Sequence, residues 1–179
     1  MQQFQIPYCL YRIILSETSG MHKILILFLS VTLILSSCSK NACSFKNDNV
    51  VAPASEQQMV KAYLDSVGIT ATLNPSGFYY KVVTPGNGST AGVCSHIDVT
   101  YTGTLTNGNV FDQQTNVLFT LGSLIDGWGK GIPLIKSGGE IKLYIPPTLG
   151  YGSSEVNTGT TVIPPNSILI FDISLLNVQ

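Results

Sequence analysis

The sequence predicts an α+β fold in which a curved antiparallel β-sheet wraps around a short helix, with a further short helix on its N-terminal side. Apolar and polar residues alternate with a period of two in several segments from residue 77 onward, as in strands with one buried face. Between these segments, residues 124–135 carry Trp128 among glycines and lack this alternation. Because a sheet with one apolar face needs a cover, we expect this segment to pack against it.

Composition limits the possible functions. The chain has 179 residues, of which only 11% are charged, and a formal net charge of −1. This length allows one domain with additional segments, and the clustered Lys and Arg of a nucleic-acid-binding surface are missing. The sequence has only two histidines, His22 and His96, no Cys–His pair and no phosphate-binding loop. We therefore expect no metal site, no cofactor and no nucleic-acid partner.

Residues 21–37 have the pattern of a bacterial secretory signal. Their apolar run, Ile24–Leu35, is too short to span a bilayer comfortably. The sequence Leu35-Ser-Ser-Cys38 resembles the lipobox of bacterial lipoproteins, whose cysteine is lipidated; the alternative is a plain signal peptide with an incidental cysteine. We expect a lipid anchor at Cys38, a location in the periplasm or at the outer membrane, and Met21 as the true start, with residues 1–20 an over-extended reading frame.

A tether and a helix are expected next. Residues 38–54 are polar and without periodicity, which is typical of a tether. A short amphipathic helix is expected over residues 55–68, with Ser55 as N-cap, Gln58 as its capping-box partner and Gly68 at the end. The helix either packs on the domain, which is the commoner case, or mediates self-association. Its apolar residues recur at helical spacing: Met59, Val60, Tyr63, Leu64 and Val67.

Two cysteines remain in the mature chain once Cys38 is lipidated. Cys43 and Cys94 can form a disulfide in an oxidising periplasm, and two free thiols are the alternative.

Four segments of the C-terminal part are predicted strands. Turn signals lie at residues 85–88 and at Asn107-Gly108, and Pro146-Pro147 ends the third strand. The residues expected on the apolar faces are Phe78, Tyr80 and Val82; Ile97, Val99 and Tyr101; Ile141, Leu143 and Ile145; and Leu169, Phe171, Ile173 and Leu175.

Short motifs with aromatic residues follow one another through the same region. They are Val99-Thr-Tyr101-Thr-Gly-Thr-Leu, Asn107-Gly, Val110-Phe111-Asp112, Phe119-Thr-Leu-Gly122, Leu124-Ile125-Asp-Gly-Trp128, Tyr151-Gly, Ile163-Pro-Pro-Asn and Leu169-Ile-Phe171-Asp-Ile. No single motif is specific, but the ordered set is. Residues 77–179 resemble the FKBP-type peptidyl-prolyl cis/trans isomerase domain of the macrolide-binding immunophilins.

The resemblance implies an FKBP-like fold with an apolar pocket for a prolyl peptide. Trp128 would form the floor of this pocket. Two groups would hold substrate carbonyls, the Ile125 backbone N–H and the Tyr151 hydroxyl. The remaining implied site residues are Tyr101, Phe111 and Phe171 as walls, Asp112 as a polar edge, Leu124 and Ile125 as further lining, and Val162 and Ile163 on an overhanging loop.

The implied activity suits a pocket without a nucleophile. The barrier to rotation about an X–Pro bond is about 18–20 kcal/mol, because resonance holds the amide planar. A twisted amide is less polar than a planar one, so a dry apolar pocket disfavours the planar ground state relative to the twisted state. Uncatalysed isomerisation takes tens of seconds or longer, which is slow enough to limit the folding of secreted proteins.

The sequence departs from the family pattern in two places. The segment between Asp112 and Phe119 is shorter than usual, and Val117 is the nearest candidate for the wall it contributes. The Arg that commonly pairs with the family's Asp is absent, so we expect Asp112 to accept hydrogen bonds from the Tyr101 hydroxyl or from the following glutamines. The loop of residues 151–163 is longer than in the minimal family domain.

Three hypotheses of function follow. The first is an active prolyl isomerase that assists folding, with proline-containing polypeptides as substrates and macrolides as possible ligands. The second is a catalytically weak FKBP-fold binding module or chaperone-like lipoprotein. The third is a lipid-anchored protein with a structural or adhesive role that does not depend on the pocket.

Overall fold

The computed structural model describes residues 43–45, 49–159 and 161–179. The predictions for residues 1–42, namely the start at Met21, the signal segment and the lipid anchor at Cys38, lie outside these described residues. Within the described residues, no helix is long and apolar enough to cross a membrane.

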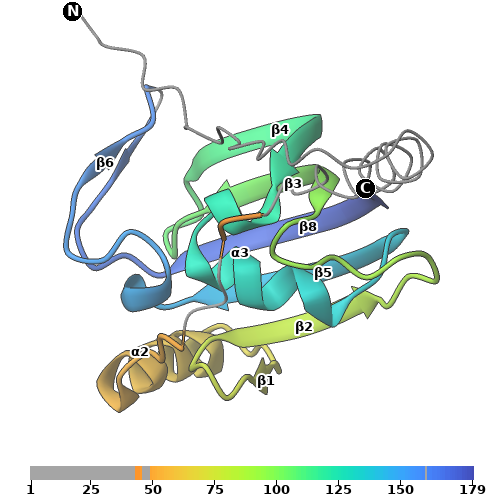
Figure 1. Cartoon of the computed structure of the whole chain (residues 1–179). Helices are drawn as coiled ribbons and strands as arrows, with labels where there is room; N and C mark the ends of the chain where they lie inside the picture. Colours follow the sequence, from red (N-terminus) through yellow and green to blue (C-terminus); the bar gives the residue numbers. More distant parts are fainter. Residues whose placement is uncertain (1–42, 46–48, 160) are drawn as a thin grey trace, which may run out of the picture. The chain divides into compact units, whose positions relative to one another are not determined.

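Six antiparallel strands form the main sheet, in the order β1-β2-β5-β8-β3-β4 (Figure 1). Every paired neighbour in this sheet is antiparallel, and the described helices are short, so the predicted α+β class is confirmed. The strands are β1 (Thr72–Leu73), β2 (Tyr79–Thr84), β3 (His96–Thr104), β4 (Val110–Thr120), β5 (Gly139–Ile145) and β8 (Leu169–Val178).

The inner face of the sheet carries most of the apolar residues that the alternation predicted. In β3, for example, buried Ile97, Val99 and Tyr101 alternate with half-buried polar residues. Val82 is an exception: it is 37% exposed and stands beside a register shift between β2 and β5. One buried cluster on this face joins side chains from β3, β4, β5, β8 and the helix that covers them.

Helix α3 (Asp126–Gly131) covers this face, as the sequence predicted for the Trp128 segment (Figure 1). Its close approach depends on glycine. A Cβ at Gly127 would lie 2.5 Å from Cδ1 of Ile145, and one at Gly131 would lie 2.7 Å from Cδ1 of Leu143. Both contacts are with β5, and a 3₁₀ turn, η2 (Ile132–Leu134), continues the helix. Glycine at these two positions therefore sets the distance between α3 and the sheet.

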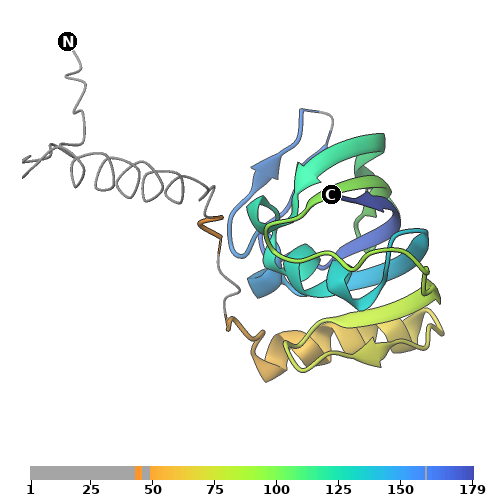
Figure 2. The ribbon, with the colours of Figure 1, turned by 45° about the vertical axis from the view of Figure 1, so that its right-hand side comes forward.

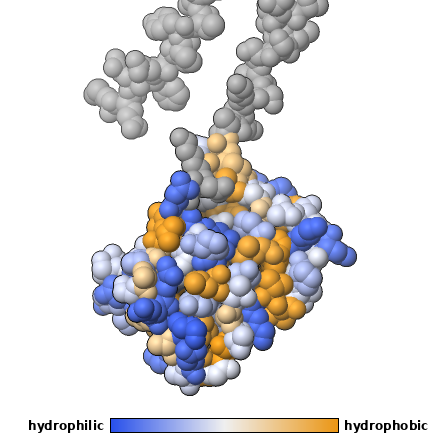
Figure 3. Space-filling model, turned by 90° about the horizontal axis from the view of Figure 1, so that it is seen from below, coloured by the Kyte–Doolittle hydropathy of each residue, from blue (hydrophilic) through white to orange (hydrophobic). Residues whose placement is uncertain are grey.

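Helix α2 (Ala54–Ser66) packs on the opposite face of the sheet, beneath β2 in Figure 2. Its buried residues, Val60 and Leu64, contact a second cluster that includes Tyr79 and Tyr144, so packing on the domain is confirmed. Met59 and Val67, also expected on the apolar face, are exposed. The side of the molecule seen from below shows apolar side chains in separate groups among polar ones (Figure 3).

The ends of α2 differ from the prediction. The N-cap is Pro53 in extended conformation, not Ser55, and its carbonyl accepts hydrogen bonds from the N–H groups of Glu56 and Gln57. The predicted capping box with Gln58 is therefore wrong. The helix ends at Ser66, with Val67 as C-cap, and Gly68 follows at φ +68° as the left-handed residue that commonly closes a helix.

Strand β4 was not among the predicted strands. It is the edge strand next to β3, and its pairing with β3 shifts register twice, between Val99 and Tyr101 and between Gly103 and Thr104. The first shift lies near Asn116, which has φ +53° and donates its N–H to the Thr100 hydroxyl over 3.1 Å. The segment that follows Asp112 is thus part of a continuous strand and contains the first of these two register shifts.

The loop of residues 151–163 also has structure that the sequence did not predict. It contains a small hairpin of β6 (Val156–Asn157) and β7 (Val162–Ile163), drawn beside β4 in Figure 1. The Thr158 hydroxyl donates to the Thr161 carbonyl over 2.9 Å, and the Thr161 hydroxyl reaches the Val110 carbonyl of β4 over 3.3 Å. The hairpin is therefore attached to the first residue of β4.

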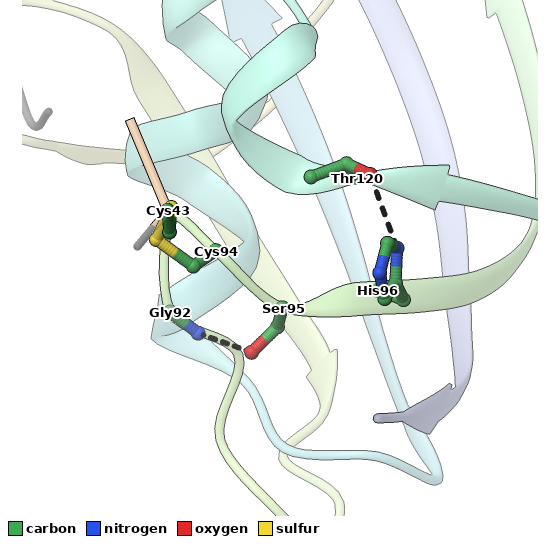
Figure 4. Close-up of a disulfide and its surroundings, with 6 residues drawn as sticks. All are labelled: Cys43, Gly92, Cys94, Ser95, His96 and Thr120. Atoms are coloured by element: carbon green, nitrogen blue, oxygen red, sulfur yellow. Dashed lines mark hydrogen bonds between the residues drawn. A yellow bond between two sulfur atoms is a disulfide. The ribbon is translucent and has the colours of Figure 1, made fainter. Parts of the chain in front are cut away.

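Cys43 and Cys94 form a disulfide with Cα atoms 5.8 Å apart (Figure 4). Of the two alternatives left by the sequence, the paired state is the one observed. The bond joins the segment before α2 to the turn before β3, where the Ser95 hydroxyl accepts the Gly92 N–H over 3.1 Å. Two residues beyond Cys43, the ring of Phe45 lies where a Cβ at Gly122 would stand. The segment is thus held near the start of η1 (Leu121–Ser123).

Candidate active site

Trp128 lies in the first turn of α3 and is only 4% exposed. The backbone N–H of Trp128 donates to the Ile125 carbonyl over 2.9 Å, and Ile125 precedes the helix in extended conformation. The backbone N–H of Ile125 therefore lies outside the helical hydrogen-bond pattern. The buried indole Nε1 has no hydrogen-bond partner within the part of the chain that the structure describes.

Three rings from three strands surround Trp128. The ring centroids of Tyr101 (β3) and Phe171 (β8) lie 5.1 Å and 5.2 Å from that of Trp128, at interplanar angles of 89° and 90°. Phe119 of β4 lies 6.4 Å away at 89°. These are edge-to-face contacts, the arrangement that aromatic quadrupoles favour. Phe119 is not among the predicted site residues, although it belongs to the motif Phe119-Thr-Leu-Gly122 and packs against the same buried cluster.

Phe111 extends this cluster through Phe171. Their centroids are 5.4 Å apart at an interplanar angle of 90°. Gly103 of β3 leaves the space for both rings, since a Cβ there would lie 2.6 Å from Phe111 Cζ and 2.9 Å from Phe171 Cε1. The predicted floor and the three predicted aromatic walls are therefore joined in one chain of ring contacts.

Asp112 forms a polar edge to this aromatic cluster. The Tyr101 hydroxyl donates to Asp112 Oδ2 over 2.5 Å, which confirms one of the two arrangements expected for this carboxylate. Burial raises the pKa of the Tyr101 hydroxyl above its ordinary value, and the hydrogen bond to Asp112 and its negative charge raise it further. The Tyr101 hydroxyl is thus held as a neutral donor.

Tyr151 stands on the turn after β5 and is 37% exposed. The flanking residues, Gly150 and Gly152, both donate their N–H groups to the Pro147 carbonyl over 2.9 Å. Burial, and then the charge of Asp112, raises the pKa of the Tyr151 hydroxyl. Asp112 thus acts on both phenols, on Tyr101 through a hydrogen bond and on Tyr151 through its charge.

The remaining predicted site residues divide into two groups. Val117, Leu124 and Ile125 are half-buried and pack against the cluster that contains Trp128. In the hairpin, Ile163 is buried while Val162 is 43% exposed. A cavity of about 440 Å³ lies beside Phe111 and Asp112, between β4 and the hairpin. It is lined by Val110, Phe111, Asp112, Gln113, Gln114, Thr158 and Thr161.

This arrangement offers hydrogen bonding and an apolar surface. In residues 43–45, 49–159 and 161–179, no group of three or more His, Cys, Asp or Glu side chains is placed to hold a metal ion. The rings in contact with Trp128 are those of Tyr101, Phe119 and Phe171, and the Tyr101 hydroxyl donates to the Asp112 carboxylate. Such a site suits a reaction that needs a conformational change of a bound amide rather than a covalent intermediate.

Comparison with known proteins gives one consistent family. Residues 88–176 match the family described as FKBP-type peptidyl-prolyl cis-trans isomerase. A probable FKBP-type peptidyl-prolyl cis-trans isomerase of Haemophilus influenzae is 45% identical over 108 residues, which are 58% of this chain and 44% of that protein. The FKBP-type isomerase FkpA of Escherichia coli is 42% identical over 108 residues, covering 58% and 38%. The chain thus matches less than half the length of these curated relatives.

Solved structures agree with these matches. The crystal structure of FkpA from Escherichia coli superposes with a TM-score of 0.62 at 31% identity, covering 92% of this chain and 75% of that one. The crystal structure of AtFKBP13 gives a TM-score of 0.55 at 33% identity, covering 62% of this chain and 99% of that one.

Proposed function

We propose a function from the premise that this chain belongs to the FKBP-type peptidyl-prolyl cis-trans isomerase family. The protein accelerates rotation about X–Pro bonds in polypeptides. The observation that carries the proposal is the buried Trp128 with the rings of Tyr101, Phe171 and Phe119 set edge-on around it. The prolyl ring binds over Trp128, and the aromatic walls exclude water from the amide.

The reaction follows from this environment. A planar X–Pro amide is held by resonance against a barrier of about 18–20 kcal/mol. Dry aromatic walls solvate the polar planar amide less well than water does. The twisted amide is less polar and loses less by this change, so the free-energy barrier between the two states falls. The Ile125 N–H and the Tyr151 hydroxyl hold the carbonyls on either side of the rotating bond. No proton is removed and no covalent bond forms or breaks.

Asp112 and Tyr101 keep the polar edge in one arrangement. The charged acceptor strengthens their hydrogen bond, and it fixes the ring of Tyr101 against Trp128. Val117, Leu124, Val162 and Ile163 line the outer parts of the pocket, where they contact residues next to the proline. We also propose that a macrolide can occupy the same pocket and compete with the peptide.

A peptide assay tests this function. The purified full chain should accelerate the cis-to-trans isomerisation of an X–Pro peptide, and a double variant, Trp128→Ala with Phe171→Ala, should lose this acceleration. Because that variant removes two buried rings, Tyr151→Phe is tested beside it as a nearly isosteric change. Wild-type protein that binds the peptide without changing its isomerisation rate would instead support the binding-module hypothesis.

We propose that the protein acts outside the cytoplasm, in the periplasm or at the outer membrane, held by lipid on Cys38, and that secreted proteins are its clients. The disulfide between Cys43 and Cys94 supports this location, because such bonds persist in oxidising compartments. Growth with labelled palmitate tests the anchor. Label should appear on the wild-type protein and be lost from Cys38→Ala; unlabelled wild type would rule the anchor out.

A further inference from the structure

One carboxylate connects α2 with the turn that carries Tyr151. Glu56, in the first turn of α2, accepts the backbone N–H of Thr148 on Oε2 over 2.9 Å. Its Oε1 accepts the Thr148 hydroxyl over 2.7 Å. The two residues are 92 positions apart in the chain, so this contact depends on the tertiary fold.

The chemistry of the turn explains why this carboxylate matters. Thr148 is the middle residue of the 3₁₀ turn η3 (Pro147–Leu149), whose first residue has no N–H to donate. The N–H of Thr148 is therefore one of the donors that a helix start leaves without an internal acceptor. Glu56 supplies that acceptor from another helix. Bonds to an ionised carboxylate are stronger than bonds between neutral groups, and two of them fix both groups of Thr148.

The same turn holds Tyr151. The Pro147 carbonyl accepts the N–H groups of Gly150 and Gly152, one on each side of Tyr151, over 2.9 Å. Glycine imposes little conformational restraint of its own, and Gly152 has φ +63°. The position of the Tyr151 ring therefore depends on η3, and Glu56 holds η3 in place through Thr148.

We propose that Glu56 is a positioning residue for Tyr151: through Thr148 it holds η3 so that the Tyr151 hydroxyl faces the substrate. The proposal rests on the function proposed above. It makes α2 part of the catalytic unit, because this helix supplies the group that fixes a rim residue of the pocket on the other side of the sheet.

The proposal is tested by substituting Glu56 in two proteins, the wild type and the Tyr151→Phe variant. In the full chain, Glu56→Ala should lower kcat/KM for an X–Pro peptide by about fivefold, within what one net hydrogen bond contributes. In a Tyr151→Phe background the same substitution should change kcat/KM by less than about twofold, because residues that act as one unit are not additive. Equal losses in the two backgrounds would overturn the proposal, and so would no loss in the wild-type background.

Matched variants separate this role from general stability. Asp65→Ala removes another carboxylate of α2, one that pairs with Lys61 in solvent, and it should leave kcat/KM unchanged. Thr148→Val should reproduce part of the loss because it deletes the hydroxyl bond, and Thr148→Ser should restore the activity. Failure of Thr148→Ser to restore what Thr148→Val loses would count against the hydroxyl contact.

A readout without catalysis keeps the proposal separate from the proposed function. In protein labelled with ¹³C-tyrosine, the Tyr151 resonance is identified by its absence in Tyr151→Phe and titrated by NMR. Glu56→Ala should lower the pKa of Tyr151 toward its ordinary value, because a loosened turn exposes the phenol and moves it from Asp112. An unchanged titration would overturn the positioning role even in an active enzyme. An inactive wild type with the shifted titration would refute only the isomerase function.

Discussion

Two alanine substitutions in α3 make the strongest test of how Trp128 is placed. Gly127 and Gly129 lie in the same short helix, on either side of Trp128, and differ in what a methyl group would meet. At Gly127 an added Cβ would lie 2.5, 2.7 and 2.8 Å from three side-chain atoms of Ile145. At Gly129 nothing lies within 4 Å. The pair therefore separates helix propensity from packing.

The magnitudes follow from this difference. Alanine in place of glycine favours a helix by about 0.5–1 kcal/mol, so Gly129→Ala should raise the free energy of unfolding by about that amount. At Gly127 the same gain is opposed by overpacking, which costs about 1–3 kcal/mol in a well-packed core. Ile145 is fully buried and β-branched, and it cannot swing aside. We expect Gly127→Ala to lower the free energy of unfolding by up to about 2.5 kcal/mol once the helical gain is subtracted.

Urea unfolding measures both variants. For a domain of this size the transition slope is about 1–3 kcal/mol per molar urea, so the two midpoints should differ by about 1 M. Gly127→Ala should also lower isomerase activity, because a shift of about 1 Å at a site can reduce a rate by two orders of magnitude. If both substitutions stabilise the protein, α3 does not press on β5 at the observed distance, and our account of the Trp128 position is wrong.

Three further outcomes are expected. Tyr101→Phe should lower the free energy of unfolding by about 1 kcal/mol or more, seen in urea, since it removes the donor to the Asp112 carboxylate. Replacing Cys43 and Cys94 by serine should lower the free energy of unfolding by about 3–4 kcal/mol, because the disulfide links residues 51 positions apart and so restricts the unfolded chain. An unchanged thermal midpoint would refute this expectation. Finally, kcat/KM should stay level up to about pH 10, because raised pKa values keep the phenols of Tyr101 and Tyr151 protonated where an ordinary phenol is half ionised; a fall to about half by pH 10 would contradict these shifts.

The sheet was largely predictable because its inner face alternates cleanly. Buried Ile97, Val99 and Tyr101 show the period of two that a strand with one covered face requires. Strand β4 was missed for a physical reason: it is an edge strand whose middle is exposed and polar, and two bulges interrupt its period. Propensity alone carries little weight in such a strand.

The start of α2 shows a different limit. Ser55 with Gln58 has the composition of a capping box, but the chain enters the helix through Pro53, which already has the extended conformation of an N-cap. The residue before Pro53 is held by a distant segment, since the Ala52 N–H donates to the Ser76 carbonyl over 3.0 Å. Local pattern cannot anticipate such contacts.

Ordered motifs indicated the aromatic members of the candidate site, but two of its features needed three dimensions. Phe119 reaches Trp128 only because β4 pairs with β3 in the observed register. The contact between Glu56 and Thr148 joins residues 92 positions apart, and no spacing rule relates them. Long-range hydrogen bonds of this kind leave no periodic trace in the sequence.

The disulfide also fixes the point at which the N-terminal side of the chain is attached to the folded part. Cys43 is bonded to Cys94 just before β3, and Phe45 lies against Gly122, so the attachment lies well before Pro53 and α2. Under the proposed lipid anchor, the covalent distance from Cys38 to this attachment is at most about 18 Å, against about 50 Å from Cys38 to Pro53. Reduction of the bond would then lengthen the greatest distance between the anchor and the domain about threefold.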